Sequence, residues 1–81
     1  MSVSKLLDYL VNDIECCLTT GISRENMVVE LLPCDYGAIA VMPSSWRYGV
    51  TVTPVAYGNH DITILGVKCV FSNSHSKVTV L

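Results

Sequence analysis

The sequence predicts an α+β domain in which an N-terminal helix packs on an antiparallel sheet of about five strands, arranged as a meander or a half-barrel. Apolar residues recur at helical spacing up to Thr19, whereas alternation with a period of two dominates later in the chain. Turn signals separate the alternating segments at short intervals. A chain of 81 residues has room for one core, so we expect residues 1–81 to form a single domain.

The segment from Ser2 to Thr19 is typical of an amphipathic helix. Either Ser2 or Ser4 can cap its first turn. Gly21 supplies the left-handed conformation in which helices commonly end. Apolar residues recur every three or four positions on one face of this helix: Leu6, Leu7, Leu10, Ile14, Cys17 and Leu18.

Residues 23–32 fit either a second helix, which Pro33 would end, or a turn followed by the strand "MVVELL". The β-branched pair and the shortness of the apolar run favour the strand. In that strand Met27, Val29 and Leu31 share one face.

The remainder of the chain is typical of β structure joined by turns. "CDYG" predicts a turn and "AIAVM" a strand that returns antiparallel to the previous one, after which "PSSWRYG" forms a loop. "VTVTPVAY" and "ITILGVKCVF" alternate as strands on either side of the turn "GNHD", and "SNSHS" leads into a last strand, "KVTVL". Pro54 suits an edge strand or a bulge, and Gly66 suggests a bulge or a close backbone contact.

Both faces of the longest predicted strand, "ITILGVKCVF", are largely apolar. A sheet with one solvated face should instead alternate with polar residues, and a single helix covers one face. With 51% hydrophobic and 15% charged residues in the chain, this surplus favours a homodimer in which two sheets pair across a two-fold axis. Curling of the sheet into a half-barrel around the helix is the alternative.

Charge and cysteine content restrict the partners and the compartment. The net charge of −2 and the scattered basic residues argue against a general binder of phosphate backbones. The N-terminal segment, interrupted by Asp8 and Asp13, is not a signal peptide, and no segment approaches the roughly 20 apolar residues of a membrane span. The four cysteines contain no Cys-x-x-Cys pair, so we expect a cytoplasmic protein with free thiols, no metal and no cofactor.

A nucleic-acid-associated regulator is one alternative, because Gly21 and Ile22 resemble the turn of a helix-turn-helix. The helix after that turn would need several donors directed at base edges. It would instead be net acidic, with Glu25 and Glu30 against the single Arg24. The sequence therefore favours the turn and strand over a reading helix.

A small thiol-dependent enzyme is the other alternative. It would pair Cys34 or Cys69 with His60 or His75 and would need a third group to orient the base. The sequence shows that these residue types exist and gives no spacing that joins them. We therefore expect no enzymatic activity.

The loop "PSSWRYG" contains the residues that we expect to bind a partner. It places the single tryptophan, Trp46, beside Arg47 and Tyr48, and these residue types are enriched in binding hot spots. Tyr36 and Tyr57 lie near turns on either side and can flank the same surface. The alternative is that Trp46 folds back and closes one end of the sheet.

No motif in the chain specifies a chemistry. The sequence therefore favours a non-catalytic protein–protein interaction module, a homodimer that also binds a larger protein. By class-level analogy, short α+β proteins without catalytic motifs look like accessory proteins of phages and mobile elements, which commonly inhibit a larger host protein by occluding it. We expect neither a nucleic acid nor a membrane as the partner.

Overall fold

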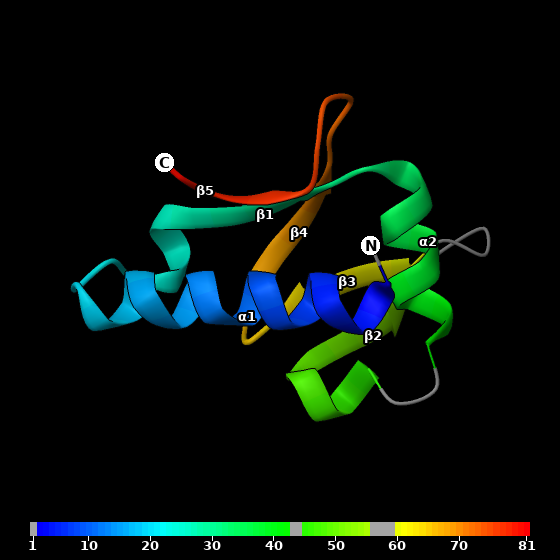
Figure 1. Cartoon of the computed structure of the whole chain (residues 1–81), viewed down its shortest axis with the longest axis horizontal. Helices are drawn as coiled ribbons and strands as arrows, with labels where there is room; N and C mark the ends of the chain where they lie inside the picture. The colour runs from blue at the N-terminus through cyan, green and yellow to red at the C-terminus, as the bar shows by residue number, and fades with distance from the viewer. Residues whose placement is uncertain (1, 43–44, 56–59) are drawn as a thin grey trace.

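A computed structural model of the chain describes residues 2–42, 45–55 and 60–81 (Figure 1). The five strands of this part form one sheet in the order β2-β3-β4-β1-β5. Neighbouring strands are antiparallel except for β1 and β4, which are parallel. The predicted α+β class, with an N-terminal helix on a sheet of five strands, is confirmed. The sheet is mostly antiparallel and is not the meander of the prediction, because β1 lies between β4 and β5 and runs parallel to β4. In chain order the elements are α1 (Val3–Thr19), η1 (Arg24–Asn26), β1 (Met27–Leu31), α2 (Pro33–Val41), η2 (Ser45–Tyr48), β2 (Val50–Pro54), β3 (His60–Ile64), β4 (Val67–Phe71) and β5 (Lys77–Val80), where η denotes a 3₁₀-helix.

The first helix begins and ends where the sequence predicts. Ser2 Oγ accepts a hydrogen bond from the backbone N–H of Lys5 at 3.3 Å and so caps the first turn. Gly21 has a φ of +93°, and its N–H and that of the next residue bond back into the last turn, as in a Schellman motif. The buried residues of α1 form the predicted stripe: Leu6, Leu7, Leu10 and Ile14.

The segment after Gly21 forms a turn and a strand, as predicted. The turn is the short helix η1, and β1 then buries Met27, Val29 and Leu31 on one face. Because β1 follows η1 directly, the helix-turn-helix alternative has no reading helix at this place. β1 lies between β4 and β5, so it forms the middle of the half-sheet that α1 covers.

The segment "PCDYGAIAV" is the helix α2, so the predicted turn and strand at this place were wrong. Pro33 occupies the first helical position, where the missing N–H costs nothing because no acceptor faces it. Asp35 in the first turn complements the helix dipole, and Ala38 and Ala40 are strong helix formers. Since the segment is apolar at nearly every position, its pattern does not separate a helical period from a strand period.

The segment "ITILGVKCVF" is two strands joined by a tight turn, so the predicted single strand was also wrong. Leu65 and Gly66 have φ angles of +53° and +82°, the signs that a type I′ hairpin turn requires at both central residues. The two turn residues reverse the chain, so the apolar side chains before and after them point to the same side. The buried residues of β3 and β4 are Ile62, Ile64, Val67 and Cys69.

The face of the sheet opposite α1 is mostly polar. Its residues follow from the register of the strands and are Val28, Glu30, Thr51, Thr53, Asp61, Thr63, Lys68, Val70, Lys77 and Thr79. The expectation that both faces of the sheet are apolar was therefore wrong. Pairing of two sheets through this face would bury little apolar surface besides Val28 and Val70.

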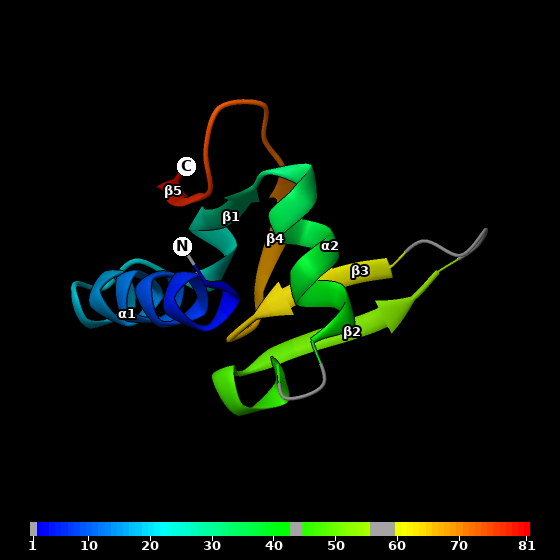
Figure 2. The same cartoon turned by 45° about the vertical axis from the view of Figure 1, so that its right-hand side comes forward.

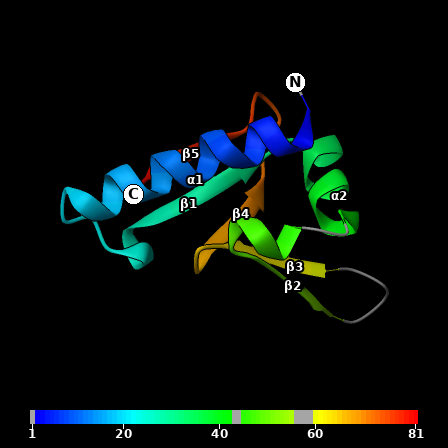
Figure 3. The same cartoon turned by 60° about the horizontal axis from the view of Figure 1, so that its bottom comes forward.

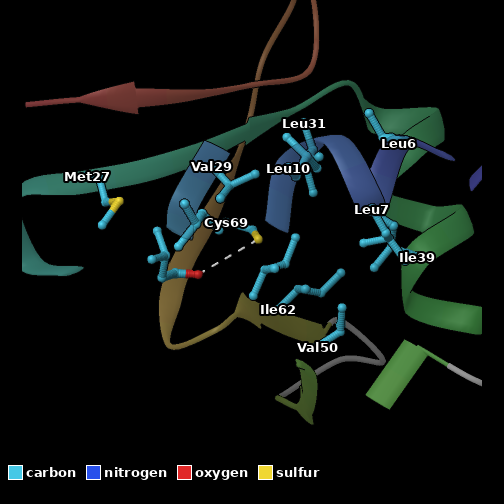
Figure 4. Packing of buried hydrophobic residues seen from close by; sticks show 13 residues of the cluster. Leu6, Leu7, Leu10, Met27, Val29, Leu31, Ile39, Val50, Ile62 and Cys69 are labelled. Atoms are coloured by element: carbon cyan, nitrogen blue, oxygen red, sulfur yellow. Dashed lines mark hydrogen bonds between the residues drawn. The ribbon is translucent and has the colours of Figure 1, made fainter. Parts of the chain in front are cut away.

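The core lies between the two helices and the inner face of the sheet. Figure 3 shows α1 running alongside β1, and Figure 2 shows α2 beside β3 and β4. In Figure 4, Ile39 of α2 lies next to Leu7 of α1, so both helices contribute to one cluster. The buried members of this cluster are Leu6, Leu7, Leu10, Ile14, Met27, Val29, Leu31, Ile39, Val50, Ile62, Ile64, Val67 and Cys69.

Candidate functional site

The residues that the sequence nominated for binding do not all gather at one place. Arg47 is exposed in η2, and Tyr48 is half-buried against the core. Tyr57 and the side chain of Trp46 lie outside the described residues. Tyr36 lies in the first half of α2, on a different part of the molecule from η2 (Figures 1 and 2). Binding through the loop around Trp46, Arg47 and Tyr48 therefore stays a prediction.

Tyr36 lies between the diverging ends of β3 and β4. These strands pair at the two residue pairs beside their turn, and β4 then pairs with β1. If the hairpin pairing continued beyond these pairs, the backbone of Ile62 in β3 would face Cys69 in β4. Instead, the backbone of Ile62 hydrogen-bonds the hydroxyl of Tyr36. The ring of Tyr36 stacks on Phe71, with centroids 4.4 Å apart and planes at 28°. Tyr36 therefore fixes α2 to both strands.

The environment of Tyr36 favours its neutral form. Burial is the main cause that raises the pKa of Tyr36, and the hydrogen bond from Ile62 acts in the opposite direction. The nearby Cys69 and Asp61 raise the pKa further. A neutral phenol held in this way positions the helix and is not prepared to act as a base.

The second helix presents an uncharged face to solvent. Its exposed positions are Pro33, Cys34, Gly37 and Val41, which share one side of the helix because they are spaced by three and four residues. Val41 is 79% exposed, and a Cβ built at Gly37 would meet no atom within 4 Å. A helix that is apolar all round is normally buried, so this exposed side is unusual for a chain in isolation.

The single charged residue of α2 is directed away from this face. Asp35 Oδ2 accepts a hydrogen bond from Ser76 Oγ at 2.6 Å. The same hydroxyl oxygen accepts the backbone N–H of Leu32, just before the helix, at 3.0 Å. These contacts join the start of α2 to the segment before β5 and fix the rotation of the helix about its axis. They therefore keep its apolar side toward solvent.

Phe71 extends the exposed apolar area from α2 onto the end of β4. The residue is 64% exposed even though its ring stacks on Tyr36. Together these residues form the α2 surface: Pro33, Cys34, Tyr36, Gly37, Val41 and Phe71. Large exposed apolar residues gathered in this way are typical of a surface that contacts another protein.

Sequence reasoning nominated Tyr36 as a flank of the Trp46 loop and did not nominate Val41 or Phe71. It assigned both of these residues to strands, where an exposed apolar side chain has no special meaning. The signal that was available is Pro33, followed by a short segment with good helix formers and one acidic residue in its first turn. That signal predicts an apolar helix, and the exposure of its face follows only from the packing.

The cysteines give no sign of an activated thiol. Burial raises the pKa of the Cys69 thiol to about 12, so this group is protonated at neutral pH. Its Sγ lies 4.0 Å from the carbonyl oxygen of Val67 (Figure 4). Cys34 is exposed on the α2 surface. In the part of the chain that the structure describes, no three His, Cys, Asp or Glu residues are placed to hold a metal ion.

Comparison of the chain with protein-family models, with curated protein sequences and with solved structures found no match. Over the described ranges, neither α-helix combines the length and the apolar character needed to cross a lipid bilayer.

Proposed function

We propose that this chain is a non-catalytic protein–protein interaction module that binds a larger protein through the α2 surface. The observation that supports it is the exposed uncharged side of α2, held toward solvent by the contacts of Asp35 with Ser76. Val41 and Phe71 are the two large apolar residues that this surface exposes most. Covering each of them fully would contribute roughly 1.5–3 kcal/mol to binding, which is the range for burying a side chain of this size.

The shape of the surface suits a close contact with a regular element of the partner. Gly37 has open space where a side chain would stand, so a partner helix or strand could approach the α2 backbone closely. Val41 and the ring of Phe71 would then bound the contact on two sides. A rigid surface of this kind acts by covering part of its partner, so we propose inhibition by occlusion as the mode of action.

We propose that the active form of the protein is a homodimer in the cytoplasm. The cytoplasmic location is supported by four cysteines that are free in the structure, which suits a reducing compartment. Small accessory proteins of phages and mobile elements commonly work by occluding a larger host protein, and the same role is proposed here by analogy of class.

Affinity capture from the native host tests the proposal. The bait is the unchanged chain, and the test variant is Val41→Glu, which places a charge at the most exposed large apolar residue of the α2 surface. Val55→Glu is the matched control, because Val55 is also exposed and directly follows the last residue of β2. Circular dichroism checks that both variants fold.

We expect Val41→Glu to lose the captured protein and Val55→Glu to retain it. Equal capture by both variants would show that the α2 surface is not the binding site. Trp46→Ala is a third bait that tests the loop around Trp46, Arg47 and Tyr48. Loss of capture by this variant alone would assign binding to that loop and would overturn the proposal for α2.

A further inference from the structure

β5 is the outermost strand on one side of the sheet. The backbone N–H of Leu81 donates to the carbonyl oxygen of Asn26 at 2.8 Å, on the side of the strand that faces β1. The backbone groups of successive residues in an antiparallel strand point to opposite sides. Val78 and Val80 therefore direct their N–H and C=O groups away from β1, toward the open edge.

The other edge of the sheet is less suited to pairing. β2 ends at Pro54, which has no N–H to donate. The short helix η2 also contacts β2. β5 contains no proline, and its one charged residue, Lys77, stands at its start. Of the two edges, β5 is the one that can accept another strand along its length.

We propose that two copies of this chain associate by antiparallel pairing of β5 with β5 about a two-fold axis at Thr79. The inference rests on the proposed function in that it names the interface of the proposed homodimer. In this register Val78 of one copy stands opposite Val80 of the other, on each side of the axis. Each such pair exchanges two hydrogen bonds, which gives about four across the interface.

The side chains agree with this register. Thr79 faces Thr79 on the polar face of the sheet, and valine faces valine on the inner face, where Val80 is 49% exposed in the single chain. Threonine pairs and β-branched pairs directly across two strands are favourable. Leu81, which is 75% exposed, would also be partly covered, because it stands opposite Lys77 of the other copy.

Charge disfavours the register centred on Lys77. Sliding the strands by two residues would centre the pairing on Val78 and place Lys77 opposite Thr79, and sliding them by four would place Lys77 directly opposite Lys77, which is unfavourable. The slide by four would also bring the second copy against residues 72–76, which precede β5. In the register centred on Thr79 the two lysines stand apart, and each keeps Glu30 of its own copy as its cross-strand neighbour.

The proposed interface is small, so the dimer should be weak. Stable interfaces bury about 1,200–2,000 Å² in total, and pairing of two four-residue strands buries less. We expect a dissociation constant on the order of 100 µM, which requires measurements at high protein concentration.

Sedimentation equilibrium and amide hydrogen exchange between about 10 µM and 1 mM protein test the pairing. The amides of Val78 and Val80 should exchange more slowly as the concentration rises. The amides of Thr79 and Leu81, which face β1, should be protected at every concentration. The variant Val80→Pro removes one outward N–H and leaves the ladder between β5 and β1 intact, so we expect it to be monomeric. Val80→Ala is the matched control, because it shortens the same side chain and keeps the N–H, and it should still dimerise.

A second variant covers the case in which Val80→Pro fails to fold. Thr79→Lys places two lysines face to face at the two-fold axis. Their repulsion should weaken association at low salt, and high salt should partly restore it by screening the charges. A monomer at all concentrations overturns the inference and the homodimer together. A dimer in which Val78 and Val80 exchange fast, or one that Val80→Pro leaves unchanged, overturns the β5 pairing and leaves the homodimer standing. Binding of a larger protein through the α2 surface is decided separately by Val41→Glu.

Discussion

Replacement of Gly49 by alanine should destabilise the chain more than the same replacement of Gly21. Gly49 has a φ of +74°, and its carbonyl oxygen accepts the backbone N–H of Leu65 at 2.9 Å. A Cβ at Gly49 would collide with Cδ2 of Leu65 and would lie 3.3 Å from its Cγ. Gly21 has a φ of +93°, but a Cβ there would meet nothing within 4 Å. Both substitutions place an alanine at a positive φ, and only the substitution at Gly49 also brings the new Cβ into collision with Leu65.

Leu65 has little freedom to move away from a new side chain. It has a φ of +53° at the hairpin turn, and its side chain packs against the core. The Nε of Arg24 also donates to its carbonyl oxygen at 2.6 Å. A non-glycine residue in the left-handed region costs about 1 kcal/mol, and displacement of a packed side chain adds roughly 1–2 kcal/mol. We therefore expect losses of about 1 kcal/mol for Gly21→Ala and about 2–3 kcal/mol for Gly49→Ala.

Urea and thermal unfolding, followed by circular dichroism at one protein concentration, measure these losses. For a domain of this size, each kcal/mol lowers the midpoint of thermal unfolding by about 4–8 °C. The larger fall should occur for Gly49→Ala. Equal falls for the two variants would show that Leu65 does not constrain the position of Gly49.

Four further predictions concern the groups that position α2 and the core thiol. Tyr36→Phe removes the hydroxyl that hydrogen-bonds the Ile62 backbone, and urea unfolding should show a loss of about 1–2 kcal/mol. Ser76→Ala removes two hydrogen bonds at the start of α2, so the amides of that helix should exchange faster while those of α1 stay unchanged. In the folded chain Cys69 should resist alkylation at pH 8, whereas the exposed Cys34 should react. Because folding raises the pKa of Cys69 from its ordinary value of 9.0 to about 12, the unfolded chain loses this proton first. The contribution of the Cys69 thiol to the free energy of unfolding should therefore fall as the pH rises from about 9 toward 12.

The parts of the fold that the sequence predicted are those in which local signals agree. The α1 helix has a cap at Ser2, a stripe at helical spacing and a stop at Gly21, and all three are present in the structure. β1 has a β-branched pair in a short apolar run, and its alternate residues are buried as predicted. At both elements the periodicity and the end signals point to the same structure.

The parts that the sequence did not predict lack such agreement. In α2 nearly every position is apolar, so neither period stands out and the Pro33 start signal was outweighed. At the β3–β4 turn, Leu65 adopts a positive φ that a bulky residue rarely takes, and tertiary contacts with Gly49 and Arg24 hold it there. Such long-range contacts are not visible in a local pattern.

The same limit applies to the candidate site. Tyr36 could be nominated from its residue type, but its partner Phe71 is far away in the sequence and meets it through the position of β4 beside α2. The exposure of Val41 depends on the rotation of α2, which the contact of Asp35 with Ser76 fixes. The apolar surplus of the chain was therefore visible in the sequence, whereas its place on the molecule was not.

The most direct test of the α2 surface is an amide map of the isotope-labelled chain as the captured partner is added. The account predicts that the amides of Cys34, Gly37, Val41 and Phe71 change most, and that those of the polar sheet face, such as Thr51, stay unchanged. Changes confined to that sheet face or to η2, with the α2 amides unaffected, would contradict the account.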